Sequence, residues 1–474
     1  MRNKKRISIL VAIVLVITLI IGYTNIRAHN ARNDTFKNID VSLLNANNIY
    51  NTIKKLTSKK YDGRLVGTAG NELATEYIIN HFKNIGLKSP DTLKDFRQNY
   101  KQNVRFTNKA PVLNIIDDDG KIVKQYDYLK DFSVATYFSS LSISGSASGK
   151  SILIEEVKDF AKDINQFEDK VVLVSKKAME KTGFANLLSQ LISNKIKIKG
   201  IIYEVDLKSE KDKYSTFVVG PNAPPIDNFV KNGPMLFMAE SETFRQIAKL
   251  SKENMDIHMA AYYSIENVKA SNVIGAIEGN DKKLKDEYII IGAHFDHVGD
   301  NKNGTYNPGA LDNASGTSVM MEIARVLKEN RIKPKKTIIF IGYNGEEEGL
   351  YGSKHYVYNP VYPLNEKTKV INLDMVGSKR KVPLELVSYD ARNVKLRNEF
   401  LKYSRKLGIE SKAGVSQGSD HASFAAKNID AVTLIHMDLK SGYHTPKDTI
   451  DNIDKNRAKE AAKVVLYYLD KYAY

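Results

Sequence analysis

From residue 271 onward, short apolar runs alternate with stretches whose apolar residues recur at helical spacing. Several runs have the length and composition of buried strands: residues 271–278, 287–293, 336–342, 369–373 and 431–435. Residues 313–330 and 454–472 have apolar positions three and four apart, which predicts amphipathic helices, the first with Asn313 as its N-cap. This alternation predicts an α/β fold, with a mostly parallel or mixed doubly wound sheet and helices on both faces.

The part of the chain before residue 271 has a different pattern. Between residues 114 and 263, short β-rich runs are separated by polar loops, which predicts a smaller α/β insert. These runs are residues 151–155, 170–174, 200–203 and 234–239. We therefore divide the chain into an amino-terminal segment (1–28), a spacer with the first part of the main domain (29–113), the insert (114–265) and the rest of the main domain (266–474).

Two short segments of the chain contain closely spaced glycines. Two helical patterns between residues 46 and 85 flank the sequence DGRLVGTAG, whose glycines indicate a turn that brings its backbone close to another segment. An ordinary connection between helices is an equally good interpretation. The sequence GSASGKS at residues 145–151 is similar to a phosphate-binding loop, but its glycines are one residue too close together and it precedes a strand, so we reject that reading.

The first residues predict where the protein is located. Arg2, Lys4, Lys5 and Arg6 precede an apolar run at residues 7–21, and this order predicts translocation of the rest of the chain. The run is slightly long for the core of a signal peptide, and no clear small-residue cleavage site follows it. We expect an uncleaved single-pass membrane anchor, with a cleaved signal and a secreted protein as the alternative. The body of the protein is extracytoplasmic in both cases.

Composition excludes several kinds of site. The chain has no cysteine, so it has no disulfide, cysteine zinc ligand or cysteine nucleophile. Its formal net charge is +16, which favours contact with anionic surfaces. The basic residues are scattered along the sequence, so we do not expect a nucleic-acid partner.

Histidines and carboxylates follow the predicted strands of the main domain. The predicted strand at residues 287–293 is followed by His294, Asp296 and His297, and the next loop carries Asp312. Later strand ends carry the triplet Glu346–Glu348, Asp374, and a loop with Tyr443 and His444. In a doubly wound sheet these positions lie along one edge. Two histidines and several carboxylates without cysteine are typical of a hydrolytic zinc or related divalent site.

Each of these residues also has an ordinary explanation. Most single histidines belong to the surface or core, a glutamate triplet is usually solvated, and an aspartate before a helix is usually a cap. Together, however, acidic residues at the ends of buried runs would repel one another unless a cation neutralised them. Adjacent Glu346 and Glu347 point in opposite directions in extended backbone, so one can bind metal while the other accepts a proton from water.

Six stretches of the sequence resemble the co-catalytic dinuclear zinc aminopeptidases, a family that includes aminopeptidase S, aminopeptidase Y and bacterial leucyl aminopeptidases. In the order of that family they are GAHFDHVG, GALDNASGTS, GEEEGLYGS, INLDMVG, GSDHASF and GYHTPKDT. The segment YDGRLVGTAG resembles the start of the family's domain. The insert, with FEDKVVLVSKK and IKGIIYEVD, more weakly resembles a protease-associated domain.

This resemblance implies a role for each candidate residue. It implies two zinc ions, with His294 and Asp374 on one ion, Glu347 and His444 on the other, and Asp312 between them. It further implies that Glu346 is the general base and acid. Asp296 would orient His294, and Tyr443 would stabilise the developing oxyanion or serve only in packing. His297 is not expected to be a ligand. The family has Glu-Glu-x-Gly-Leu where this chain has a third glutamate, Glu348, so the register of the pair could be shifted by one.

The resemblance therefore implies an extracytoplasmic metallopeptidase that acts on peptides, with an aminopeptidase as the leading expectation. A carboxypeptidase or another amidohydrolase on the same site is the alternative within enzymes. A non-catalytic receptor is a further alternative, but such a protein is expected to have lost metal ligands, and this chain keeps them all. Side-chain preference, oligomeric state and the native metal do not follow from the sequence.

Overall fold

The structure is a computed structural model. It describes residues 36–134, 144–155, 164–206, 234–391 and 394–474, except for residues 182, 184–185, 187–188 and 192–195. The predicted anchor, residues 7–21, lies outside the described residues. Among the helices that are described, none is both long enough and apolar enough to cross a membrane.

The main domain is built around a mixed sheet that has ten strands within the described residues. Its order is β14-β13-β15-β12-β10-β11-β9-β1-β2, and β4 pairs with β9. The strands are β1 (Arg97–Ile116), β2 (Ile122–Tyr126), β4 (Gly145–Gly149), β9 (Asp256–Ile277), β10 (Tyr288–His294), β11 (Thr337–Tyr343), β12 (Lys369–Asp374), β13 (Leu384–Ser388), β14 (Ser411–Val415) and β15 (Asp430–Ile435).

The centre of this sheet is parallel, as the sequence predicted. Strand β10 pairs in parallel with both β11 and β12, and β12 pairs in parallel with β15. All seven residues of β10 and of β11 are buried, because helices cover the sheet from both sides. Burial of each large aliphatic side chain in these strands contributes about 1.5–3 kcal/mol. The remaining strands make the sheet mixed.

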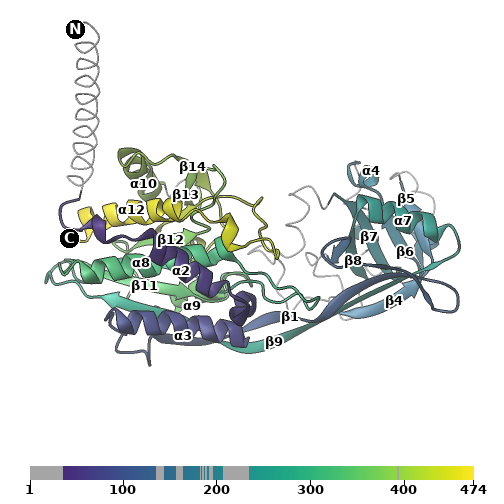
Figure 1. The fold of residues 1–474 in the computed structure, drawn as a ribbon, viewed down its shortest axis with the longest axis horizontal. Helices are drawn as coiled ribbons and strands as arrows, with labels where there is room; N and C mark the ends of the chain where they lie inside the picture. Colours follow the sequence, from purple (N-terminus) through teal and green to yellow (C-terminus); the bar gives the residue numbers. More distant parts are fainter. Residues whose placement is uncertain are drawn as a thin grey trace, which may run out of the picture.

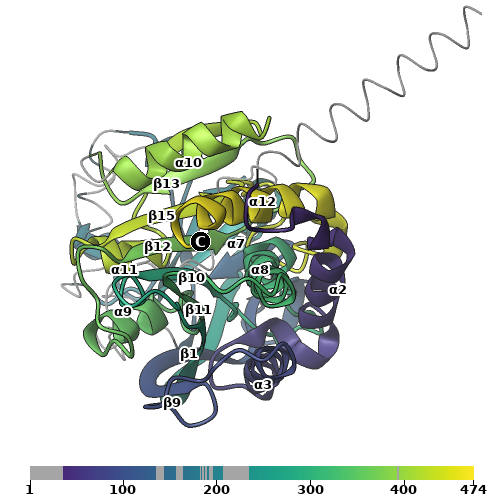
Figure 2. The ribbon, with the colours of Figure 1, turned by 90° about the vertical axis from the view of Figure 1, so that its left-hand side faces the viewer.

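Helices cover the two faces of the sheet unequally (Figure 2). The first face packs against α2 (Ala46–Leu56), α3 (Ala69–Asn84), α8 (Gly316–Glu329), α10 (Lys395–Lys406) and α12 (Lys455–Tyr472). The second face packs against α9 (Tyr351–Tyr358) and α11 (His421–Ala425). The predicted helix at 454–472 is α12, whereas α8 starts later than predicted. Asn313 is not its N-cap, because a turn at Ala310–Ser315 precedes the helix and Ser315 takes the cap position.

Strands β1 and β9 are much longer than the sequence predicted. The run at 271–278 is only the last part of β9, a strand of 22 residues that pairs antiparallel with the 20-residue β1 along nearly its whole length. Figure 1 shows the two strands leaving the main sheet together and continuing to a second, smaller body. The segment GSASG, rejected above as a phosphate-binding loop, forms β4 on the outer part of β9.

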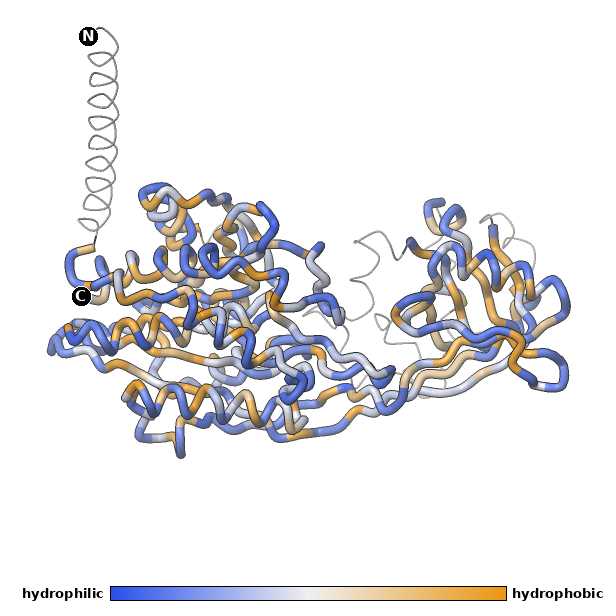
Figure 3. Tube along the Cα trace, viewed as in Figure 1, coloured by the Kyte–Doolittle hydropathy of each residue, from blue (hydrophilic) through white to orange (hydrophobic). Residues whose placement is uncertain are grey.

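The smaller body contains a five-stranded sheet of order β3-β8-β7-β6-β5. Its strands are β3 (Phe132–Val134), β5 (Ser151–Ile154), β6 (Val171–Val174), β7 (Gly200–Val205) and β8 (Met235–Glu240), and the described helices are α4 (Lys176–Met179) and α7 (Ser241–Ser251). Strands β5 to β8 pair in parallel in order, while β3 joins β8 antiparallel. Its apolar strands are visible as an orange centre in Figure 3.

The glycine-containing loop before α3 makes the close approach that its sequence indicated. Gly63 has a φ of 69°, and a Cβ atom there would lie 2.7 Å from backbone atoms of Gly299 and Asn307. Only glycine fits both this conformation and this spacing. The loop therefore packs directly against the segment that follows β10. The remaining short helical turns are Val41–Leu43, Lys59–Arg64, Ile164–Phe167 and Ile450–Asn452.

Candidate metal centre

The candidate site lies at the carboxyl ends of the parallel strands. His294 is the last residue of β10, Asp374 is the last residue of β12, and Asp312 lies in the turn before α8. Glu347 follows β11, and His444 lies in the loop after β15. The structure thus brings residues separated by up to 150 positions in sequence to one edge of the sheet, and all five side chains are buried.

These side chains form two adjacent groups that could each hold a metal ion. His294, Glu346 and Asp374 form one group, and His297, Asp312, Glu347 and His444 form the other. Within each group the possible ligand atoms lie within 4.8 Å of one another. Neither group includes Glu348.

Asp312 faces both groups. Its Oδ1 atom lies 3.4 Å from Nε2 of His294, and its Oδ2 atom lies 2.9 Å from Nε2 of His444. His294 Nε2 is also 3.5 Å from Oδ1 of Asp374, and His444 Nε2 is 2.9 Å from Oε2 of Glu347. One carboxylate therefore presents a separate oxygen to each of two histidine–carboxylate pairs, which is the arrangement of a bridging ligand.

The polar atoms of the site fit a cation better than they fit one another. Nε2 of His444 is close to two carboxylate oxygens but has no hydrogen bond, and Oδ1 of Asp374 also has no partner. Leaving such buried atoms unsatisfied costs about 1–3 kcal/mol each. Imidazole nitrogens and carboxylate oxygens without cysteine are the ligand atoms of hydrolytic zinc sites. The residues present therefore fit a pair of zinc ions.

Burial and charge determine the protonation of the site. Burial, with the charges of Glu347, Asp420 and Asp374, raises the pKa of Glu346 well above its ordinary value, although His294 opposes this shift. Burial would also raise the pKa of Asp312, but contacts with His294 and His444 outweigh it and hold that pKa well below the ordinary value. The surroundings of the two carboxylates thus favour the protonated form of Glu346 and the ionised form of Asp312.

Asp296 and His297 each contact a candidate ligand. Oδ1 of Asp296 lies 3.7 Å from Nδ1 of His294, and its Oδ2 accepts a hydrogen bond of 3.2 Å from the backbone N–H of Glu347. Nδ1 of His297 lies 2.7 Å from Oε1 of Glu347. Burial lowers the pKa of His297, which favours its neutral form. A neutral imidazole can donate Nδ1–H to Glu347 and so orient that carboxylate.

Three residues that support the site through hydrogen bonds were not predicted from the sequence. Ser419 donates a 2.6 Å hydrogen bond to Oδ2 of Asp374, and the Asp448 carboxylate accepts hydrogen bonds from the backbone N–H groups of Leu311 and Asp312. Arg64, from the glycine-containing loop, is fully buried and donates to the carbonyl oxygens of Leu56, Phe295, Pro308 and Gly309. All three lie in stretches quoted for the family resemblance, so the motifs indicated the positions of these residues but not their roles.

The remaining candidates lie beside the two groups. The ring of Tyr443 stacks on that of His444, with centroids 3.8 Å apart, and burial together with nearby carboxylates raises the pKa of its hydroxyl well above the ordinary value. The hydroxyl therefore remains a hydrogen-bond donor. Asp420 is buried close to Asp296 and Asp374, and burial raises its pKa to about 7.

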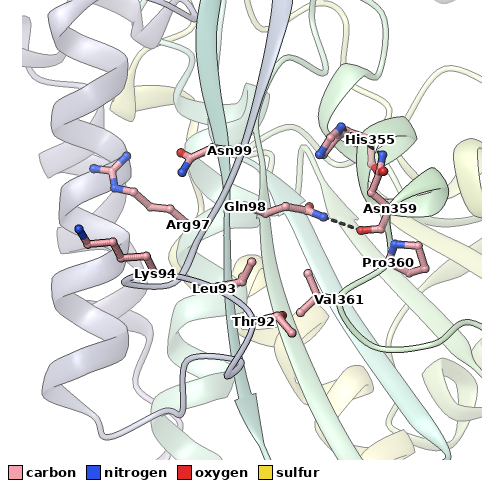
Figure 4. Close-up of a pocket in the computed structure, with 10 residues that line it drawn as sticks. All are labelled: Thr92, Leu93, Lys94, Arg97, Gln98, Asn99, His355, Asn359, Pro360 and Val361. Atoms are coloured by element: carbon pink, nitrogen blue, oxygen red, sulfur yellow. Dashed lines mark hydrogen bonds between the residues drawn. The ribbon is translucent and has the colours of Figure 1, made fainter.

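Two hollows in the surface differ in how close they lie to the metal groups. One, of about 470 Å³, lies between residues 92–99 and the end of α9, and none of its lining residues belongs to the two groups (Figure 4). There Gln98 donates a hydrogen bond to the carbonyl oxygen of Asn359. A smaller hollow, of about 30 Å³, is lined by Glu347, Glu348, Arg105 and Tyr263. The smaller one adjoins the metal groups, and β1 and β9 contribute to its wall.

Comparison with known proteins agrees with this geometry. Residues 272–469 match the model of peptidase family M28. The chain is 35% identical over 209 residues to aminopeptidase YwaD of Bacillus subtilis, a match that covers 42% of this chain and 44% of the relative. It is 34% identical over 222 residues to a probable leucine aminopeptidase of Trichophyton verrucosum, covering 43% of this chain and 56% of the relative. The matched segment thus spans about half the length of these relatives.

Solved structures share the fold over nearly the whole chain. An aminopeptidase from Aneurinibacillus sp. strain AM-1 superposes with a TM-score of 0.64 at 23% identity, covering 91% of this chain and 95% of the other. BSAP, a zinc aminopeptidase from Bacillus subtilis, superposes with a TM-score of 0.58, also at 23% identity, covering 90% and 94%. The chain therefore shares the mixed α/β architecture of these structures, and its residues 272–469 match the model of peptidase family M28.

Proposed function

We propose that this protein is an extracytoplasmic zinc metallopeptidase, and specifically an aminopeptidase that removes residues from the amino terminus of peptides. The observation that supports this proposal most strongly is Asp312, whose two oxygens face two histidine–carboxylate pairs at 3.4 Å and 2.9 Å. A shared carboxylate between two such pairs has a clear use in a dinuclear hydrolytic site. The names of the relatives favour a peptidase that acts on amino termini.

Each group would hold one zinc ion. His294 and Asp374 would bind the first ion, Glu347 and His444 the second, and Asp312 both. When bound, the ions acidify water towards neutrality and polarise the substrate carbonyl. Asp296 would fix the ring of His294, and His297 would fix the carboxylate of Glu347 without binding metal. This assignment agrees with the separation of Glu346 and Glu347 into different groups, and it leaves Glu348 outside both.

Glu346 would move the proton in the reaction. Its carboxylate lies in the group of His294 and Asp374, is half-buried, and has a pKa raised by burial. It would accept a proton from the attacking water as the water oxygen bonds to the carbonyl carbon. It would then deliver that proton to the leaving nitrogen as the C–N bond breaks. Tyr443, whose hydroxyl stays protonated, would donate a hydrogen bond to the carbonyl oxygen as negative charge develops there.

Paired substitutions test these roles. Glu346→Gln should lower kcat by at least about 10²-fold, the usual contribution of general acid–base catalysis, while metal content stays near two ions per chain. Glu347→Gln is the matched control and should lose metal as well as activity. If Glu347→Gln instead keeps its metal and loses only turnover, the register of the glutamates is shifted by one. A metal-free chain with full activity would refute the dinuclear site.

A substrate panel separates the enzymatic alternatives. The purified protein should release amino acids from aminoacyl substrates and peptides with a free amino terminus. Hydrolysis of N-blocked substrates alone would favour a carboxypeptidase or another amidohydrolase on the same site. No hydrolysis by a protein that binds two metal ions would favour the non-catalytic receptor.

The insert and the amino-terminal segment complete the proposal. We propose that residues 114–265 are a protease-associated domain, an idea supported by the separate five-stranded sheet of parallel strands β5 to β8. The basic residues before the apolar run at 7–21 support a membrane anchor with the body outside the cytoplasm. Protease digestion of intact cells should remove the body of the protein and leave a short membrane fragment.

A further inference from the structure

The end of the main domain opposite the metal centre is formed by turns at the amino ends of the parallel strands. We define the basic face as residues 279–287 and 328–336, together with residues 37–40 and 470–474, which hydrogen bonds hold beside them. The Asp470 carboxylate accepts hydrogen bonds from the backbone N–H groups of Lys37, Asn38 and Ile39. Backbone bonds also join Lys335 to Ala473 and Asn280 to Pro334. Figure 2 views the molecule from this end.

The basic face has a dense excess of positive charge. It contains ten basic residues: Lys37, Lys282, Lys283, Lys285, Lys328, Arg331, Lys333, Lys335, Lys336 and Lys471. It contains six acidic residues: Asp40, Asp281, Asp286, Glu287, Glu329 and Asp470. The basic face therefore carries a net charge of +4 on 27 residues, whereas the whole chain carries +16 on 474 residues. The density of positive charge on this face is about four times the average of the chain.

Three of the six carboxylates of this face have partners inside the protein. Asp470 is buried against backbone N–H groups, Glu287 forms ion pairs with Lys336 and Lys367, and Glu329 forms one with Arg325. In contrast, several exposed cations have no carboxylate within ion-pair distance among the described residues: Lys37, Lys282, Lys283, Lys285, Arg331 and Lys333. These cations are free to bind an external anion.

Apolar groups are interspersed with these cations. The side chain of Ile332 is 49% exposed between Arg331 and Lys333, and that of Tyr472 is 37% exposed beside Lys471. Nζ of Lys471 lies 5.9 Å from the Tyr472 ring. Exposed aliphatic and aromatic side chains next to lysine and arginine are typical of surfaces at the membrane–water interface, where the ring or methyl groups enter the headgroup layer. An exposed aliphatic side chain such as that of Ile332 would contribute little to the binding of nucleic acid.

We propose that the basic face docks on an anionic lipid surface, so that the metal centre points away from the membrane. The place where the amino-terminal segment joins the main domain supports a lipid rather than another anion. Phe36 packs on Tyr467 of α12 at this end of the domain. At most about 50 Å of chain can separate Phe36 from the apolar run at 7–21, which is the proposed membrane anchor. The metal centre lies at the other ends of strands of six or seven residues, about 20 Å away. This orientation keeps its carboxylates away from anionic headgroups and leaves it open to dissolved peptides.

The absence of cysteine permits a direct measurement of orientation. We would reconstitute the full chain into nanodiscs that carry an energy-transfer acceptor on the lipid headgroups, either of pure phosphatidylcholine or with one quarter phosphatidylglycerol. A single cysteine replaces Asp286 on the basic face and is labelled with a donor dye. A second protein carries Lys302→Cys, an exposed position in the loop that follows β10 at the metal-centre end. Transfer from position 286 should rise when phosphatidylglycerol is present, while transfer from position 302 should stay low.

Charge removal provides the matched comparison. The triple substitution of Lys282, Lys283 and Lys333 by Gln should lower the ratio of docked to undocked molecules by on the order of 10²-fold, since each cation near an anionic surface contributes about a fivefold factor. The same three-charge change at the exposed Lys121, Lys249 and Lys252 of the smaller body is the control and should have little effect. High salt should reduce the docked fraction of the unsubstituted protein.

Three results would overturn the proposal. The first is equal transfer from position 286 with and without phosphatidylglycerol, and the second is an equal loss in the two triple variants. The third is tighter binding of a short DNA duplex than of phosphatidylglycerol by the basic face, which would make it a nucleic-acid surface. Peptidase activity, measured on the same samples, should not change in either triple variant. Intact docking by a protein without activity would refute the proposed function and leave this inference standing.

Discussion

The two sheets of this protein have parallel strands that end in acidic residues, yet among the described residues only the larger sheet forms a candidate metal site. In the smaller sheet, β8 ends at Glu240 and β7 carries Glu204 near its end. The Glu240 carboxylate accepts a hydrogen bond of 2.7 Å from the N–H of Glu242, and that of Glu204 accepts one of 3.0 Å from the N–H of Lys176. Each carboxylate thus pairs with a backbone N–H group at the start of a nearby helix.

In the larger sheet, the corresponding residues face one another instead. Asp374 and Glu347 are buried and turn towards histidines, and Asp374 Oδ1 and His444 Nε2 have no hydrogen-bond partner. Parallel strand order alone therefore does not produce a metal centre. The larger sheet differs because it buries more hydrogen-bond acceptor atoms than there are donors to pair with them. A bound cation would pair with the acceptors that remain.

The largest expected effect comes from removing the shared carboxylate of the larger sheet. Asp312→Ala should lose most of the bound metal and lower kcat/KM by more than about 10³-fold, because both groups depend on its two oxygens. Metal analysis and assays on aminoacyl substrates measure the two losses. Glu204→Ala, which removes a strand-end carboxylate from the smaller sheet, is the matched control. Equal losses in both variants would show that the two sheets do not differ in the proposed way.

Acid should destabilise the larger domain through a buried histidine outside the metal groups. Burial, with a smaller effect from Arg457, lowers the pKa of His436 to about 3, and its Nδ1 accepts a hydrogen bond from the N–H of Gly377. Between pH 6.5 and pH 3 the unfolded chain binds a proton at this position that the folded protein does not. The free energy of unfolding is therefore highest above pH 6.5 and falls as the pH falls.

From pH 7 to pH 4 this single group should account for a loss of about 3 kcal/mol. Denaturant unfolding at the two pH values measures it, with His436→Asn as the comparison because asparagine can accept the same N–H but does not titrate. The difference between pH 7 and pH 4 should be smaller in the variant. An identical pH dependence in both proteins would mean that His436 is accessible to protons in the folded state.

The metal centre could be predicted from sequence because its signals are local. Four of the five candidate ligands lie close to the end of an apolar run or the start of a helix, and His444 lies in a loop after such a run. Parallel strands bring such positions to one edge. The central strands were therefore predicted to within about two residues. The turn before α8 was missed, since nothing in the sequence around Asn313 shows that the backbone continues past it before the helix begins.

The features that sequence reasoning missed depend on distant pairing. Strand β1 pairs with a strand more than a hundred residues later, and its many polar residues give no continuous apolar run. The role of Arg64 likewise appears only when the loop before α3 packs against residues 295–309. Such contacts are determined by the folded arrangement rather than by local propensity, and a single sequence does not reveal them.

The smallest predicted effect tests the other half of the comparison. If Glu240 serves only as the cap of α7, then Glu240→Ala should lower the free energy of unfolding of the smaller body by about 1 kcal/mol, since the N–H of Glu242 loses its partner. Hydrogen exchange within α7 measures this local loss, and metal content and kcat/KM should not change. Glu253→Ala, at an exposed glutamate after the same helix, is the control and should leave exchange unaltered. A fall in kcat/KM in the Glu240 variant would show that strand ends of the smaller sheet also contribute to catalysis, and that the two sheets are not functionally distinct.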